Sequence, residues 1–442
     1  MAAPDLDRVT APPTSALAAA EIIAVGSELL GWTRIDTNSL FITERLSALG
    51  VEVTGKSVVG DDRPRLRAYF EAALARTDLV VLTGGLGPTD DDVTREVVSE
   101  ALSLPLVEDI SITSRIRERF ERRGLRMPEV NRRQAMVPRG ATVLPNAHGT
   151  APGLFIESPD GSGRVVVLLP GPPRELQPML SALCDGGALA MRAGVERVHT
   201  VSLFTTQRSE SHVDEIAQPI YGPWRDERPP IETTILATPG QIELHLTSRS
   251  ADPAAAVRRL DAARDELAHA LGAAVFSTDG RSLHRLVGDM LRERSMTIAA
   301  AESCTGGLFL ERLTDVTGSS DYVAGGIVAY SDALKVSLLG VDPAIIAVHG
   351  AVSEPVAAAM ADGIYERTGA GVSVSITGIA GPGGGTPSKP VGTVVIGVRV
   401  TDQPLSVRTH VFPGGRDQVR FQATQAALDV VRRLLLPGLS CE

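Results

Sequence analysis

The chain has 442 residues, of which 43% are hydrophobic and 22% are charged, and its formal net charge is -10 at pH 7. This balance is typical of a soluble globular protein, and the length predicts two to four domains at about 150 residues each. The acidic charge disfavours general binding to nucleic acid, because such binding needs a basic face that neutralises phosphates. No apolar run reaches the roughly 18 residues that span a bilayer, so we expect no membrane role.

The N-terminal residues and the cysteines indicate the compartment. Residues 1–18 hold acidic residues and prolines but no apolar core, which disfavours a signal peptide and predicts a loose tail. Cys184, Cys304 and Cys441 lie far apart, a spacing that predicts neither a disulfide framework nor a zinc site. We therefore expect a cytoplasmic protein.

The rest of the chain alternates apolar runs with amphipathic stretches. Over residues 19–183 the order is strand, helix, strand, helix, strand, which is typical of a parallel sheet flanked by helices in an α/β domain. Residues 184–279 offer two strands and an Ala-rich helix, which predict a small α+β module without a catalytic cluster. A second alternation of helices and strands fills residues 280–442, so we place a domain boundary at the sequence TDG that ends at residue 280.

The first candidate site is LVVLTGGLGPTDDDVT at residues 79–94, an expected strand, glycine-rich turn and helix. Such a turn exposes backbone N–H groups at a helix N-terminus, where anions bind. Its run of three aspartates either caps the helix or supplies oxygen ligands for a divalent metal beside a phosphate. Because the C-terminal ends of parallel strands meet at one edge, Glu28, Asp61 and Asp92 could share that edge.

Other motifs accompany this turn within the first 183 residues. They comprise Glu28, Leu29, Leu30, Asp36, Thr37, Asn38, Gly60, Asp61, Asp62, residues 83–89, Asp91, Asp92 and Thr94. Together they resemble the molybdopterin-binding-like domain of CinA-type (competence/damage-inducible) proteins. Ser27 departs from the usual aspartate of that family, and LPGPPREL at residues 169–176 departs from its methionine ending.

This first resemblance implies a three-layer α/β domain that cleaves the pyrophosphate of ADP-ribose-like dinucleotides with a divalent metal. It implies that Asp92 is catalytic. The substrate-binding residues that it implies are Gly84, Gly85, Gly87, Thr89 and Asn38, and the metal ligands are Glu28, Asp61, Asp91 and Asp92. From the residues alone, the interpretation stops at an anionic nucleotide or pterin site.

The second candidate site begins at TIAAAESCTGG, residues 297–307, where an expected strand turns into a helix. A nucleophile at such a turn is favoured by the helix N-terminus, and adjacent N–H groups can form an oxyanion hole. Ser303 and Thr305 could instead be simple helix caps. Cys304 is a rival nucleophile, since a thiol at a helix start can have a lowered pKa, but no histidine stands in a recognisable triad context.

A serine nucleophile needs a base, and a lysine can serve when it is buried. Lysine occurs only three times in the chain, and Lys335 lies on an expected helix, five residues after Tyr330. Tyrosine and lysine at that spacing are otherwise packing residues whose polar ends reach solvent. A third motif, at residues 372–398, is a strand followed by a glycine-rich loop, which either holds a phosphate or amide oxygen or forms a flexible lid or turn.

These three motifs resemble the C-terminal domain of CinA-type proteins and the stand-alone nicotinamide mononucleotide (NMN) amidohydrolases, over residues 281–436. The resemblance implies deamidation of NMN to nicotinic acid mononucleotide and ammonia without a cofactor. Its active-site positions are Ser303, Tyr330 and Lys335, with Thr305 as a helper. The substrate-binding positions that it implies are Gly306, Thr377, Gly378, Gly381 and Arg416.

The sequence therefore predicts a bifunctional pyridine-nucleotide hydrolase with small-molecule nucleotide substrates, and the resemblance implies a homodimer. The competing interpretation is a non-catalytic nucleotide- or pterin-binding protein that acts through partner proteins.

Overall fold

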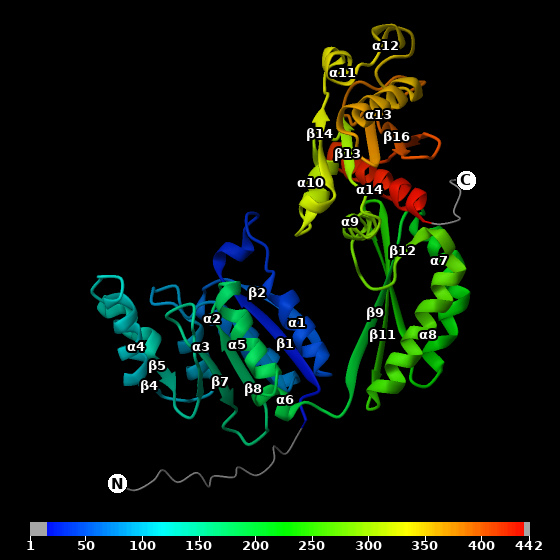
Figure 1. Ribbon diagram of the computed structural model, residues 1–442. Helices are drawn as coiled ribbons and strands as arrows, with labels where there is room; N and C mark the ends of the chain where they lie inside the picture. The colour runs from blue at the N-terminus through cyan, green and yellow to red at the C-terminus, as the bar shows by residue number, and fades with distance from the viewer. Residues whose placement is uncertain (1–15, 437–442) are drawn as a thin grey trace. The chain divides into compact units, whose positions relative to one another are not determined.

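The computed structural model describes residues 16–436 (Figure 1). Of the tail expected over residues 1–18, residues 1–15 lie outside the described part. Leu17 is buried, and its N–H donates to the Arg192 carbonyl at 2.9 Å, so the packed chain begins before residue 19. No helix in the described part is long and apolar enough to cross a membrane.

Two compact units make up the chain. The first comprises the residues up to His199 with Arg249–Ala256, and the second comprises Thr200–Ser248 with the residues from Val257 onward. The expected middle module and the expected C-terminal domain thus belong largely to one unit, and the boundary expected near residue 279 falls inside it.

The first unit is built on a six-stranded sheet with the order β2-β1-β3-β8-β7-β6. Its strands are β1 (Ala19–Val25), β2 (Glu52–Val59), β3 (Leu79–Thr83), β6 (Thr142–Leu144), β7 (Gly153–Glu157) and β8 (Val165–Leu169). Strands β2, β1, β3 and β8 are parallel, as expected, and every residue of β3 and β8 is buried, as in strands covered on both faces. Strand β7 runs antiparallel to both of its neighbours, β8 and β6, which the sequence analysis did not predict, and a short loop joins β7 to β8.

Helices cover both faces of this sheet and create three layers. The elements are α1 (Asn38–Ala48), α2 (Arg63–Arg76), α3 (Thr94–Ala101), α4 (Ile110–Glu121), α5 (Pro173–Cys184) and α6 (Ala188–Arg192), with 3-10 turns at Ser27–Leu30 and Glu129–Ala135. One core packs α1, α5 and α6 on one face, and another packs α2, α3 and α4 on the opposite face. A two-stranded sheet of β4 (Leu106–Glu108) and β5 (Met136–Pro138) flanks α4. The expected three-layer α/β architecture is confirmed.

The middle module contains more structure than expected. Its sheet has the order β10-β11-β9-β12, with β9 (Arg197–Thr205), β10 (Glu232–Thr238), β11 (Gln241–Ser250) and β12 (Val275–Ser277). Two helices, α7 (Glu210–Tyr221) and α8 (Pro253–Leu271), share one core with this sheet, and short 3-10 turns lie at Gly222–Asp226 and Gly272–Ala274. Strand β10 escaped prediction because its side chains are at least partly exposed, so it lacks a buried apolar face.

The C-terminal sheet has the order β14-β13-β15-β16-β17. Its strands are β13 (Ile298–Glu302), β14 (Val323–Val328), β15 (Val372–Gly378), β16 (Thr393–Val400) and β17 (Ser406–Val411), and the first three are parallel. One core joins the sheet to α9 (Leu283–Glu293), α10 (Leu308–Thr314) and α14 (Arg416–Leu435). Another core joins it to α11 (Asp332–Leu339), α12 (Pro343–His349) and α13 (Glu354–Thr368), and a 3-10 turn lies at Ser319–Asp321. This half is therefore a second α/β domain.

Candidate functional site

A cleft of about 930 Å³ lies at the carboxyl ends of the parallel strands of the first unit. The predicted residues that line it are Glu28, Asn38, Asp61, Gly84, Gly85, Gly87, Asp91 and Asp92. Thr89 does not line this cleft, because its N–H and hydroxyl donate to Asp92 Oδ2 at 2.9 and 2.6 Å. The structure therefore gathers the predicted residues at one edge of the sheet and gives Thr89 a supporting position.

The aspartates of the turn do not cap the following helix. The N-cap residue of α3 is Val93, and no side chain accepts a hydrogen bond there. Asp92 instead receives the two bonds from Thr89, and hydrogen bonding from the Thr89 side chain lowers the pKa of Asp91. Asp91 thus stays available as a charged group, and both carboxylates line the cleft.

Ser27, which departs from the usual aspartate, pairs with Asp61. The Ser27 N–H donates to Asp61 Oδ2 at 2.9 Å, and the Asp61 N–H donates to Ser27 Oγ at 3.2 Å. An aspartate at position 27 would place a second negative charge against Asp61, whereas serine closes a reciprocal pair that carries only the charge of Asp61.

The carboxylates fit only a metal site that substrate helps to complete. Among residues 16–436, no three histidine, cysteine, aspartate or glutamate side chains are grouped closely enough to hold a metal ion. Mg²⁺, however, commonly takes one or two carboxylates and completes its shell with water and substrate phosphates. The four acidic residues that were expected as ligands, Glu28, Asp61, Asp91 and Asp92, suit that kind of ion and disfavour a cage built from protein alone.

Basic side chains that the sequence analysis missed line the same cleft. They are Arg34, Arg119, Arg123 and Arg174. Arg119 also fixes one wall, since its guanidinium donates to the carbonyls of Ala147 and His148 at 3.2 and 2.8 Å. Guanidinium groups match phosphate oxygens well, so these residues equip the cleft for an anionic ligand. No local motif marks them, because they come from elements distant in sequence.

Asn38 connects two loops of the cleft and keeps one acceptor unused. Its Nδ2 donates to the Gly171 carbonyl at 2.7 Å, while its Oδ1 is buried without a partner in the described chain. A buried acceptor without a partner is costly unless a ligand supplies a donor. This atom is the natural position for a substrate hydroxyl.

We expect Gly84→Ala to destabilise the first unit far more than Gly140→Ala. The two glycines have φ values of 92° and 88°, but a Cβ at Gly84 would overlap the Val25 carbonyl, whereas nothing lies within 4 Å at Gly140. The Gly140 change therefore costs only the left-handed strain of about 1 to 2 kcal/mol, and the Gly84 change adds about 1 to 3 kcal/mol for moving the backbone. Urea unfolding measures both, and equal losses would contradict the close approach.

The second predicted site gathers at one edge of the C-terminal sheet. Glu302, the last residue of β13, pairs with Val328 of β14 and Ile376 of β15. The next N–H, that of Ser303, donates to the Ile376 carbonyl at 2.8 Å. Ser303, Tyr330 and Thr377 therefore leave or end three adjacent parallel strands on the same edge, as the sequence order predicts.

Lys335 is buried on α11 and turned toward the end of β14. It is 2% exposed, and its Nζ donates to the Tyr330 carbonyl at 3.2 Å and lies 3.6 Å from Asp332 Oδ1. The Asp332 side chain is 60% exposed, so solvent weakens this ion pair. A lysine so thoroughly buried beside a sheet edge is unusual and is typical of a functional amine.

The turn after β13 is organised by Glu302, a residue that the sequence analysis did not single out. Its carboxylate is fully buried and accepts the N–H groups of Gly307, Phe309 and Leu310 at 2.9, 3.1 and 3.0 Å. The N-terminus of α10 is thus already occupied by a side chain of the protein and does not bind substrate.

Gly306 does not have the free backbone donor that its expected substrate-binding role requires. Its N–H donates to the Ser303 carbonyl at 3.1 Å, so it has no free donor for substrate, and α10 begins at Leu308 rather than at Thr305 or Gly306. The helix starts later because Gly306 and Gly307 both have positive φ, 60° and 96°. In the described chain, the N–H groups of Cys304 and Thr305 have no acceptor, and the buried Thr305 Oγ1 has no partner. The available oxyanion donors therefore belong to residues 304 and 305.

Cys304 has a thiol that is unsuited to nucleophilic chemistry. It is 7% exposed, and burial raises its pKa to about 12. The thiol therefore stays protonated near neutral pH, which argues against the rival nucleophile.

Arg416 connects the glycine-rich loop to Tyr330. Its guanidinium donates to the Gly381 carbonyl at 2.9 Å and to the Tyr330 hydroxyl at 3.3 Å. Thr377, in contrast, donates its hydroxyl to the Ala351 carbonyl at 2.9 Å and so holds the edge together. Gly378 ends β15 beside Thr377. The structure thus brings all the predicted residues of this domain to one region.

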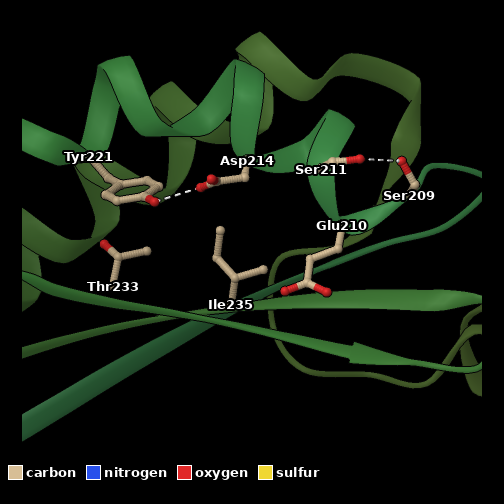
Figure 2. Close-up of a pocket in the computed structure, with 7 residues that line it drawn as sticks. All are labelled: Ser209, Glu210, Ser211, Asp214, Tyr221, Thr233 and Ile235. Carbon is tan, nitrogen blue, oxygen red and sulfur yellow. Dashed lines mark hydrogen bonds between the residues drawn. The ribbon is translucent and has the colours of Figure 1, made fainter.

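A separate hollow of about 600 Å³ lies between α7 and β10 in the middle module (Figure 2). Tyr221 donates to Asp214 Oδ1 at 2.6 Å, and burial raises the pKa of Tyr221 to about 12. Glu210 lies on the same wall, so the hollow has acidic character and disfavours anions. It holds no predicted site residue.

The chain carries two α/β domains, each with a candidate site at one edge of its sheet, and comparisons identify its family. The family model "Probable molybdopterin binding domain" matches residues 21–186, and the model "CinA C-terminal domain" matches residues 280–435. A CinA-like protein of Koribacter versatilis is 46% identical over 418 residues, covering 94% of this chain and 100% of that protein. A putative competence-damage inducible protein of Symbiobacterium thermophilum is 45% identical over 427 residues, covering 94% and 99%. The chain belongs to the CinA family, and the resemblance inferred from the sequence is confirmed.

Solved structures cover parts of the chain. The competence/damage inducible protein CihA from Agrobacterium tumefaciens is 35% identical, covers 34% of this chain and 93% of that chain, and has a TM-score of 0.34. The molybdopterin biosynthesis enzyme MoaB from Thermus thermophilus is 23% identical, covers 40% and 98%, and has a TM-score of 0.27.

Proposed function

We propose that this protein is a bifunctional pyridine-nucleotide hydrolase whose C-terminal domain deamidates NMN. The observation that carries the proposal is the buried Lys335 amine beside the sheet edge where Ser303 and Tyr330 emerge. Serine with a lysine base is a known solution for amide chemistry.

The proposed deamidation has two steps. Ser303 Oγ attacks the carboxamide carbon of NMN while the neutral Lys335 amine takes the hydroxyl proton, and the developing oxyanion receives the N–H groups of Cys304 and Thr305. The C–N bond then breaks, and Lys335 returns the proton to the departing ammonia. Water hydrolyses the resulting ester, which frees nicotinic acid mononucleotide and restores Ser303.

Two groups position the substrate in this proposal. The Thr305 hydroxyl, buried without a partner in the described chain, donates to the oxyanion or the carboxamide. Arg416, already bonded to Tyr330 and Gly381, directs its charge toward the substrate phosphate. No cofactor is needed for this step.

We further propose that the N-terminal domain cleaves the pyrophosphate of ADP-ribose-like dinucleotides. When bound through carboxylates among Glu28, Asp61, Asp91 and Asp92, a divalent metal would neutralise the phosphoryl oxygens and activate water. The residues themselves bind the substrate: Arg119 and Arg123 pair with phosphates, and Asn38 Oδ1 accepts a sugar hydroxyl. The metal's identity and the expected homodimer stay predictions.

An assay of the purified chain tests both activities. We expect ammonia from NMN with or without EDTA, because no metal serves that site, and AMP from ADP-ribose only with added Mg²⁺. Asp92→Ala should impair only the second reaction, since Asp92 lines the N-terminal cleft. Saturable binding of both nucleotides without turnover by folded protein would instead support the non-catalytic binding protein.

A further inference from the structure

A basic cleft lies within the second unit, and its lining includes none of the residues predicted for either catalytic site. It has a volume of about 800 Å³ and is lined by residues of five regions: the segment between β9 and α7, helix α7, the turn before β12, strand β17 and helix α14. Its charged or titratable residues are Arg208, His212, Arg408, His410, Asp429 and Arg433. Among the described residues of the lining there are three arginines and one aspartate, although the chain carries a net charge of -10.

The single carboxylate of the basic cleft is already engaged. Asp429 is 2% exposed, its Oδ1 accepts from Arg432 at 2.7 and 2.9 Å, and its Oδ2 accepts from Arg433 at 2.8 Å. Asp429 and its two guanidinium partners together keep one net positive charge, and Arg208 adds a second. Asp429 therefore does not neutralise the positive charge of the cleft.

Local geometry also points to a ligand. Arg208 is exposed and makes no ion pair with any described residue, and it follows Gln207, whose φ of 61° is rare outside glycine. The buried His410 Nε2 has no partner in the described chain, while the His410 ring stacks on Phe412 with centroids 5.3 Å apart. Along β17, Ser406, Arg408 and His410 alternate onto one face, which turns polar donors toward the cleft.

The opposite part of the lining is apolar. Ala273, Ala274, Ala426 and Val430 supply it. A cleft of this volume with convergent cations and an apolar patch suits a ligand that joins a phosphate to a flat, partly apolar body. Inorganic phosphate would leave the apolar patch unused.

A long polyanion fits the surroundings less well. Ser209 lines both the basic cleft and the hollow shown in Figure 2, whose walls carry Glu210 and Asp214. A nucleic-acid backbone that continued past Ser209 would meet these carboxylates and be repelled.

We propose that the basic cleft is a binding site for a nucleoside monophosphate. Arg208, Arg408 and Arg433 surround its phosphate, and the patch of Ala274, Ala426 and Val430 lies against the nucleoside.

Calorimetry with AMP, inorganic phosphate and a single-stranded RNA decamer as probes tests this site. AMP should bind wild-type protein at least about tenfold more tightly than phosphate. Arg208→Gln and Arg408→Gln should each raise the Kd of AMP at one class of site about tenfold or more, because each removes a charged hydrogen bond to the phosphate. Arg258→Gln, an exposed arginine of α8 outside the cleft, is the matched control and should bind as wild type does.

Peptide mapping after photolabelling wild-type protein with 2-azido-AMP tests the location without any variant. Label within residues 406–413 or 426–433 supports the proposal, and its absence from both overturns it. Three other outcomes would overturn it as well. They are equal affinity for AMP and phosphate, unchanged AMP binding by both cleft variants, and binding of RNA that is tighter than that of AMP and is abolished by these variants. The proposed N-terminal site would also bind AMP as its product, so the cleft variants and the labelled peptides, rather than total AMP binding, assign AMP to the basic cleft.

Discussion

Ser303→Ala is expected to lower kcat for ammonia release from NMN by at least about a thousandfold, because it removes the hydroxyl that forms the ester in the proposed mechanism. Its N–H anchors the turn to Ile376 through the backbone, so the substitution leaves that bond intact. The cleavage of ADP-ribose should be unchanged, since Ser303 belongs to the other compact unit. A coupled assay for ammonia measures the first effect, and AMP release measures the second.

Cys304→Ala is the matched control at the neighbouring position. The buried thiol, with its pKa raised to about 12, contributes packing rather than a thiolate. We expect its kcat to stay within about threefold of wild type, although loss of a buried sulfur lowers stability by about 1 kcal/mol. An inactive but folded Cys304→Ala, together with an active Ser303→Ala, would assign the chemistry to the cysteine instead.

The sequence was sufficient to predict the edges at which both sites form. Strands β3 and β13 are short apolar runs that end in glycine-rich turns, and each is followed by a helix. Because parallel strands end at a common edge, motifs far apart in the chain were expected to converge, and Ser303, Tyr330 and Thr377 do so. Hydrophobic pattern and topology are enough for this step.

Contacts between distant elements could not be predicted in the same way. Arg119 comes from α4 and lines the N-terminal cleft. Its position depends on how α4 packs within the domain, which no local motif encodes. The antiparallel edge formed by β6 and β7 escaped for the same reason, since strand direction depends on the loop between partners. Register and side-chain direction are decided by the whole core rather than by the segment itself.

The role of Glu302 could not be predicted from the sequence of its own motif. In sequence it is the final polar residue of an apolar strand, and nothing distinguishes it from a solvated strand end. In the folded protein its carboxylate takes three N–H groups of α10, which leaves only the donors of Cys304 and Thr305 for an oxyanion. The assignment of donors in the turn therefore required hydrogen-bond partners, not residue types.

Lys335→Met and Lys335→Arg should separate a catalytic amine from a structural cation. Methionine fills a similar volume without an ionisable group, and arginine keeps the charge but cannot release its proton. If Lys335 is the base, both variants lose about 10² to 10⁴ in kcat for NMN. If Lys335 served only its ion pair with Asp332, arginine would retain activity and Asp332→Asn would resemble methionine.

Chemical rescue makes this prediction independent of how well the larger arginine fits at a position that is 2% exposed. Lys335→Ala removes the buried side chain whose Nζ donates to the Tyr330 carbonyl in the native protein and leaves a void in its place. Added ethylamine should enter that void and restore a measurable part of the lost kcat, with a dependence on pH that follows the free amine. Ethanol, of similar size but without a basic nitrogen, is the control and should restore nothing. If ethanol also restores kcat, or if neither compound does so in a folded variant, then Lys335 takes no part in the proton transfer. It would then be a packing residue near Tyr330.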